Sequence, residues 1–110
     1  MQEPEHNQSV EIAMQVILFA GNARDLILKA LSEANIENFE KAKELLEKAE
    51  EEARSAHRYQ TDFIQSEARG EDINISILLI HAQDTLMVAL SEINVAKQLI
   101  KIYEKMASIK

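Results

Sequence analysis

The histidine at position 81 and the aspartate at position 84 are the residues whose types and spacing suggest chemistry. They lie in "ISILLIHAQDTLM", residues 75–87, where His81 follows a run of large aliphatic side chains. Residues three apart on a helix are neighbours on one face. A neutral imidazole keeps a free ring nitrogen near neutral pH, so His81 is a candidate phosphoryl acceptor. From spacing alone a structural histidine in a helical core is the commoner interpretation, and both stay open.

Two other chemistries find little support in the sequence. Using His81 as the general base of a serine hydrolase would require a nucleophile elbow or a glycine-rich oxyanion loop, and neither motif is present. A zinc site would need cysteines or a second histidine at helical spacing. The chain has no cysteine, and His57 has no HExxH-type partner. We therefore expect neither a conventional hydrolase nor a zinc site.

Composition bounds the class of protein. The 110 residues, with two glycines and one proline, predict a single all-α domain spanning 1–110, of which 1–8 form a polar leader. Nineteen acidic and twelve basic residues give a net charge of −7, which disfavours nucleic acid and anionic membranes as partners. No signal peptide and no apolar stretch of about 20 residues is visible, so we expect a cytoplasmic protein without membrane insertion.

Apolar residues recur at three- and four-residue spacing in three segments. The first is predicted over about 9–34 with Ser9 as N-cap, and Gly21 within it is interpreted as a point of close backbone approach. The second begins near Asn38 as a cap, and its charge run over 41–54 is interpreted as a solvated face. Residues 66–74 are predicted to form a surface loop. The third segment runs over about 75–106, capped by Asn74 or Ser76.

Three long helices with short connections predict an antiparallel up-down-up three-helix bundle. Over residues 75–90 the third helix is apolar nearly all round, and a bundle of three helices covers only part of that circumference. We therefore expect an oligomer in which this part of the third helix meets its copies.

Three motifs in this order resemble those of the lactose/cellobiose-type enzyme IIA components of the bacterial phosphoenolpyruvate-dependent sugar phosphotransferase system. They are "HAQDTLM" from His81, "AHRYQT" from Ala56 and "AGNAR" from Ala20, and the resemblance covers about residues 10–105. The chain departs from the family pattern at Asp25, where serine is frequent, and at Ile80, where valine is usual.

The resemblance implies a homotrimer and a role in phosphoryl transfer. His81 would accept a phosphoryl group from the histidine-containing phosphocarrier protein and pass it to a cysteine of the cognate IIB component. Asp84 would meet its two copies on the threefold axis around a divalent metal, typically Mg²⁺, with Gln83 as a supporting polar contact. His57 would lie near the transfer site or have a structural or solvent-facing role.

The sugar stays open at this stage among lactose, cellobiose, chitobiose and other β-glucosides. His6, in the polar leader, is assigned no role. A competing hypothesis from a different class is an acidic helical-bundle adaptor that oligomerises through the third helix without chemistry. In such an adaptor, His81 and Asp84 would be buried polar residues that set the register of the helices.

Overall fold

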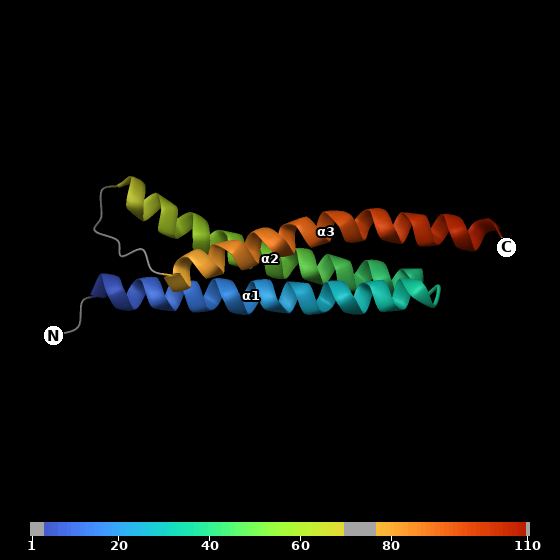
Figure 1. Ribbon diagram of the computed structural model, residues 1–110, viewed down its shortest axis with the longest axis horizontal. Coiled ribbons are helices and arrows are strands. Elements are labelled where there is room, and N and C mark those ends of the chain that lie inside the picture. The colour runs from blue at the N-terminus through green and yellow to red at the C-terminus, as the bar shows by residue number, and fades with distance from the viewer. Residues whose placement is uncertain (1–3, 70–76, 110) are drawn as a thin grey trace.

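Three long helices form an elongated bundle in the computed structural model, which describes residues 4–69 and 77–109 (Figure 1). They are α1 (Pro4–Asn35), α2 (Phe39–Ala68) and α3 (Ile77–Ile109). α1 and α3 run in the same direction and α2 runs against both, within extents of 66 × 22 × 19 Å. The predicted all-α, up-down-up architecture is confirmed. None of the helices in the described ranges is long and apolar enough to cross a membrane.

The helix ends differ from the predicted ones in two places. α1 begins at Pro4, so the prediction of Ser9 as its N-cap is wrong. Proline suits the first turn of a helix because its fixed φ is helical and its missing N–H has no partner there, and the polar residues that follow it tolerate a helix. α2 continues to Ala68, two residues into the predicted loop 66–74. The remainder of that loop, with the cap candidates Asn74 and Ser76, lies outside the described residues.

The turn between α1 and α2 is closed by backbone hydrogen bonds. The N–H of Asn38 donates to the carbonyl of Glu33 over 2.9 Å, and the N–H of Glu37 donates to Ala34 over 3.0 Å. This pair of bonds is the Schellman pattern, and it requires a left-handed residue, here Glu37 with φ 65°. Asn38 directly precedes α2 as predicted, and its side-chain amide donates to Glu33 Oε1 over 2.9 Å.

The core of the bundle is built mostly from alanine. The first two helices contribute Ala20, Ala23, Ala30 and Ala34 from α1 and Ala42, Ala49 and Ala53 from α2, all at most 1 % exposed. On α3, Ile93 and Ile100 are buried against these alanines, and Leu86 is buried in a second, smaller cluster with Ala13, Val16, Ala56 and Ala82. Small side chains let the helix axes approach closely in both clusters. Val10 begins the three- and four-residue spacing of the first segment, which is expected to be buried, but it is 36 % exposed.

Gly21 lies in the middle of α1 without ending the helix. A Cβ added there would meet no atom of the chain within 4 Å, so the predicted close approach does not occur between helices of one chain. Gly21 instead lies on an exposed side of α1.

The bundle is not equally tight along its length. At the end that holds the N-terminus of α3, the last turns of α2 diverge from α3, as Figure 1 shows. A cavity lies in this space, beside the turn of α3 that carries His81.

Candidate functional site

His81 and Asp84 lie in the second turn of α3, on its solvent-facing side. Both side chains are exposed, whereas Ala82 and Leu86 between and after them are buried at 1 % and 0 % exposure. The interpretation of His81 as a residue that fills the core is therefore wrong. Helical periodicity explains the difference, because His81 is one residue before the core position Ala82 and Asp84 is two residues after it, which turns their side chains about 100° and 200° away from that position.

Large apolar side chains surround this pair on the outside of α3. Ile77 is 86 % exposed, Ile80 53 %, and Met87 and Val88 just above 40 %. Asp84 is the acidic residue among them. His81 thus stands on an apolar surface that the bundle leaves uncovered, as the all-round apolar pattern predicted. The hydroxyl of Thr85, one turn further on, donates to the backbone carbonyl of His81 over 2.9 Å.

The exposed apolar surface extends well beyond residue 90. On α3 it continues along the side opposite to the core, and we call this set of exposed side chains the α3 stripe: Ile77, Ile80, Met87, Val88, Val95, Leu99, Ile102, Met106 and Ile109. A second set, the α1 stripe, lies on the parallel helix: Val10, Met14, Leu18 and Leu28. The sequence reasoning limited the exposed surface to residues 75–90. From Val95 onward, exposed apolar residues recur every three or four positions on a different side of the helix from Ile93 and Ile100. This spacing could have predicted the longer exposed surface.

A bidentate ion pair fixes the register between α1 and α3. Arg24 Nε donates to Glu92 Oε1 over 2.9 Å, and Arg24 Nη2 donates to Glu92 Oε2 over 3.1 Å. The hydrogen bond and the charge of Glu92 raise the pKa of Arg24. Because α1 and α3 are parallel, this register puts His81 level with the turn of α1 around Ala13 and Met14. Both stripes therefore flank His81.

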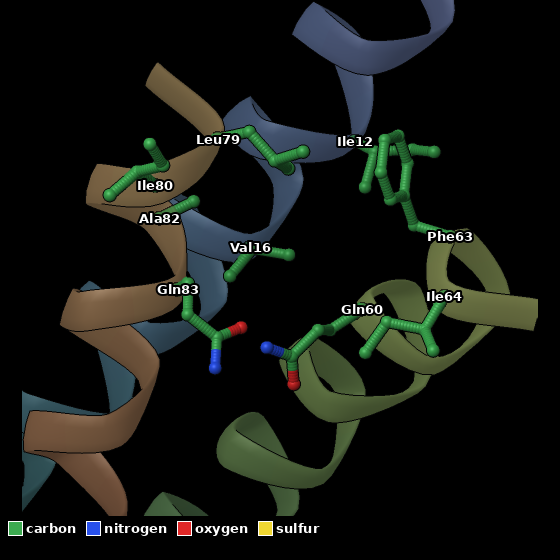
Figure 2. A pocket seen from close by; sticks show the side chains of 9 residues that line it. All are labelled: Ile12, Val16, Gln60, Phe63, Ile64, Leu79, Ile80, Ala82 and Gln83. Atoms are coloured by element: carbon green, nitrogen blue, oxygen red, sulfur yellow. The ribbon is translucent and has the colours of Figure 1, made fainter. Parts of the chain in front are cut away.

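Gln83 lines a cavity of about 200 Å³ between the three helices (Figure 2). Its amide points toward that of Gln60 on α2, and the walls are apolar, with Val16 from α1 and Phe63 from α2. This cavity lies on the α2 side of α3. Gln83 is exposed and points toward the α2 side, on a different side of the helix from Asp84.

His57 does not lie beside His81. It is exposed on α2 and lines a groove between α2 and α3, opposite Leu90. Leu90 follows His81 by nine residues, which is two and a half turns, so the two histidines belong to opposite sides of α3 and to different heights of the bundle. Of the two placements implied for His57, the solvent-facing one agrees with the structure.

The described part of one chain does not by itself assemble a metal site. Among residues 4–69 and 77–109, no three histidine, cysteine, aspartate or glutamate side chains are grouped closely enough to hold an ion. Asp84 offers a single carboxylate on an apolar stripe. Further carboxylates for a hard cation would have to come from other copies of the chain.

The fold and the site define a class of protein. It is an up-down-up three-helix bundle that presents a histidine on an exposed apolar face of its third helix. The sequence matches the family model for the lactose/cellobiose-specific IIA subunit of the phosphotransferase system over residues 11–104. The chain belongs to this family and is a IIA component of a sugar phosphotransferase system. Its relatives carry the names of such phosphotransferase components.

Individual relatives agree over nearly the whole chain. The lichenan-specific phosphotransferase enzyme IIA component of Bacillus subtilis is 41 % identical over 100 residues, covering 90 % of this chain and 91 % of the relative. A lactose-specific EIIA component from Staphylococcus epidermidis is 42 % identical, covering 86 % of this chain and 90 % of its own.

Solved structures give the same answer. The cellobiose-specific enzyme IIA from Bacillus anthracis superposes with a TM-score of 0.89 at 42 % identity, covering 98 % of this chain and 95 % of that one. The chitobiose IIA protein of Escherichia coli, solved in complex with HPr, has a TM-score of 0.79 at 29 % identity, with 97 % and 99 % covered.

Proposed function

We propose that this chain carries a phosphoryl group on His81 during sugar uptake. The observation that supports the proposal most directly is the exposure of His81 on an uncovered apolar face, within the "HAQD" motif of a confirmed IIA component. A histidine placed for transfer between two proteins must be reachable from outside the bundle, and this one is.

The chemistry is two successive displacements at phosphorus. A ring nitrogen of His81 attacks the phosphoryl group of the donor's phosphohistidine, so one P–N bond forms as the donor's P–N bond breaks. A cysteine thiolate of the acceptor then attacks, a P–S bond forms, and His81 regains its free nitrogen. Such transfers depend mainly on positioning and on charge stabilisation. A rigid helix supplies the position, and the apolar surroundings limit water near the phosphoramidate.

The proposed donor is the histidine-containing phosphocarrier protein, and the proposed acceptor is a cysteine of the cognate IIB component. The complex of the Escherichia coli chitobiose IIA protein with HPr supports this donor, since that relative has the same fold over nearly its whole length. Transfer between such partners would take place in the cytoplasm. We treat residues 1–110 as one IIA domain, supported by the family match over 11–104.

A homotrimer is proposed to cover the Asp84 side of the apolar face and to leave His81 accessible at the edge of the interface. The α1 and α3 stripes lie on parallel helices and together make an exposed apolar surface as long as the bundle, which a stable monomer rarely presents. Two further copies of the chain are suitable partners for this surface. A different apolar partner would bury Asp84, the acidic residue of the α3 stripe, without a group to neutralise its charge.

Three Asp84 carboxylates brought together would repel one another unless a cation lies between them. Their oxygens are the ligands that Mg²⁺ prefers, so the donor set fits a magnesium ion, which would neutralise the charge at the centre of the assembly. The proposed ion therefore requires three copies of the chain, since the described residues of one chain hold no group of three such ligands.

The test of the function is direct phosphorylation. The protein is incubated with phosphoenolpyruvate, the general phosphotransferase enzyme and the histidine-containing phosphocarrier protein, and intact mass is measured. We expect a mass increase of one phosphate that is stable in base and lost in acid. An unchanged mass, with a known IIA component phosphorylated in parallel, would favour the adaptor hypothesis.

A further inference from the structure

Interhelical ion pairs follow a regular pattern along the groove between α2 and α3. Lys43 Nζ lies 2.7 Å from Glu104 Oε2, and Lys97 Nζ lies 2.8 Å from Glu50 Oε2. In each pair one residue comes from α2 and the other from α3. The pairs are seven residues apart on both helices, so the antiparallel helices keep one register over this heptad.

The pattern stops at the next turns. The register that joins Glu50 to Lys97 puts Arg54 level with Ile93, next to Asn94, and His57 level with Leu90. Here α3 offers Arg54 and His57 only amide and aliphatic side chains, and no carboxylate. Among the residues that the structure describes, neither Arg54 nor His57 takes part in a hydrogen bond or ion pair.

A cavity of about 400 Å³ opens at this position. Its floor is apolar, formed by Ala53 and Ile93, which are 1 % and 4 % exposed, with half-buried Leu90 beside them. Its rim carries Arg54, His57 and Asn94, all exposed, and the Lys97–Glu50 pair closes one end. With Glu50 offsetting Lys97, Arg54 leaves the cavity with net positive charge in a chain whose total is −7.

We propose that this cavity binds a small organic phosphate, whose phosphoryl oxygens replace the missing carboxylate. Arg54, Asn94 and His57 together present more N–H donors than a single carboxylate accepts, and Arg is suited to bidentate recognition of phosphate. The apolar floor accommodates the carbon part of the ligand. Inorganic phosphate would use the rim alone and bind less tightly.

This site is separate from the proposed transfer site. Leu90 and Asn94 follow His81 by nine and thirteen residues, about 14 to 20 Å along the helix, and face α2 rather than the two stripes. The proposal does not depend on phosphorylation of His81, and binding should persist in His81→Ala.

The experiment titrates the full-length protein with phenyl phosphate at fixed ionic strength and follows the His57 ring resonances by NMR, with calorimetry for affinity. Inorganic phosphate and benzyl alcohol are titrated in parallel. We expect saturable binding of phenyl phosphate, weaker binding of inorganic phosphate, and none of benzyl alcohol. The absence of saturable phenyl phosphate binding, or equal binding of benzyl alcohol, would overturn the proposal.

Two variants and one control locate the site. Arg54→Gln should weaken phenyl phosphate binding about tenfold or more, which is the usual range for a lost charged hydrogen bond. Asn94→Asp should also weaken it, because the new carboxylate would pair with Arg54 from within the chain. Arg58→Gln is the matched control: this arginine is one turn further along α2 and bonds to Ser55 outside the cavity. An equal loss in Arg58→Gln would show non-specific attraction and overturn the assignment.

Discussion

The guanidinium of Arg24 on α1 and the carboxylate of Glu92 on α3 share two hydrogen bonds of 2.9 and 3.1 Å. This contact joins the two helices that run in the same direction and carry the exposed stripes. It lies in "AGNAR", one of the motifs on which the family resemblance was based. The motif thus has a visible structural task, which is to set the relative height of α1 and α3.

Removing the pair should have a small effect on stability. Both side chains are at least 40 % exposed, so Arg24→Gln should lower the free energy of unfolding by no more than about 1 kcal/mol. Because the pKa of Arg24 is raised, the contribution of the pair is complete below the ordinary arginine pKa and is lost only above it. The loss should therefore be the same across neutral pH, as measured by denaturant unfolding at several pH values. A loss that varied across that range would show that another group titrates with the pair.

His81→Ala should keep the helical far-ultraviolet spectrum and lose phosphorylation completely, because the side chain is exposed and contributes little to the core. His57→Ala should still be phosphorylated, since His57 lies on the α2 side of the bundle. Mass spectrometry after incubation with the donor system measures both. Phosphorylation of His81→Ala together with its loss in His57→Ala would mean that the acceptor was assigned wrongly.

Ile102→Asp should weaken self-association. Ile102 follows Asp84 by eighteen residues, five full turns, and lies on the same side of α3 with 52 % exposure. A charge buried there without a partner should reduce the association constant more than about tenfold. Ile64→Asp is the matched control, because Ile64 is 53 % exposed but lies on α2 and belongs to neither stripe. Sedimentation velocity at micromolar concentration measures both. A monomeric wild-type protein, or equal effects of the two variants, would contradict a trimer built on the stripes.

Chelation should weaken the trimer at neutral pH if Mg²⁺ holds three Asp84 carboxylates together. Asp84→Leu should lose the metal and keep or strengthen association, because apolar residues that replace buried charges are often stabilising. Metal content after gel filtration and sedimentation with and without chelator provide the readout. A trimer of the wild-type protein that is indifferent to chelator and free of metal would rule out the ion.

Glu37→Gly should stabilise the fold. Glu37 holds φ 65° at the end of α1, a conformation that costs a residue with a Cβ roughly 1 kcal/mol and glycine almost nothing. After the greater backbone entropy of glycine in the unfolded chain is subtracted, we expect a gain of about 0.5 kcal/mol. Thermal unfolding compared with Glu37→Ala, which keeps a Cβ, separates the backbone effect from the loss of the charge. An equal gain in Glu37→Ala would attribute the effect to the carboxylate.

The helices and most of the core could be predicted because both depend on local periodicity. Leu86, Ile93 and Ile100 recur every seven residues and are all buried. The exposure of residues around His81 and Asp84 also followed from a local pattern, since an all-round apolar segment exceeds what one bundle covers. The prediction that the first helix begins after Ser9 was wrong. Serine is a frequent N-cap, but no residue after Pro4 prevents the helix from starting earlier.

Features that depend on how distant residues meet could not be predicted. The Arg24–Glu92 pair joins residues 68 positions apart, and its geometry is set by the relative height of two helices. The same holds for the cavity opposite Arg54 and for the divergence of α2 from α3. Gly21 is the clearest example. A small residue in a helix is consistent with close packing, but the sequence does not show which surface, if any, lies against it.

An interior made largely of alanine reverses the usual sensitivity of a protein to mutation. In most cores the damaging change is truncation, which leaves a void. Here positions such as Ala20, Ala49 and Ala89 have a single methyl group to lose and neighbouring helices in direct contact with it. Enlargement by one or two carbon atoms would force helix axes apart along their whole length. The chain should therefore tolerate alanine-to-glycine changes better than alanine-to-valine changes, and sequence drift in its core should be confined to the smallest side chains.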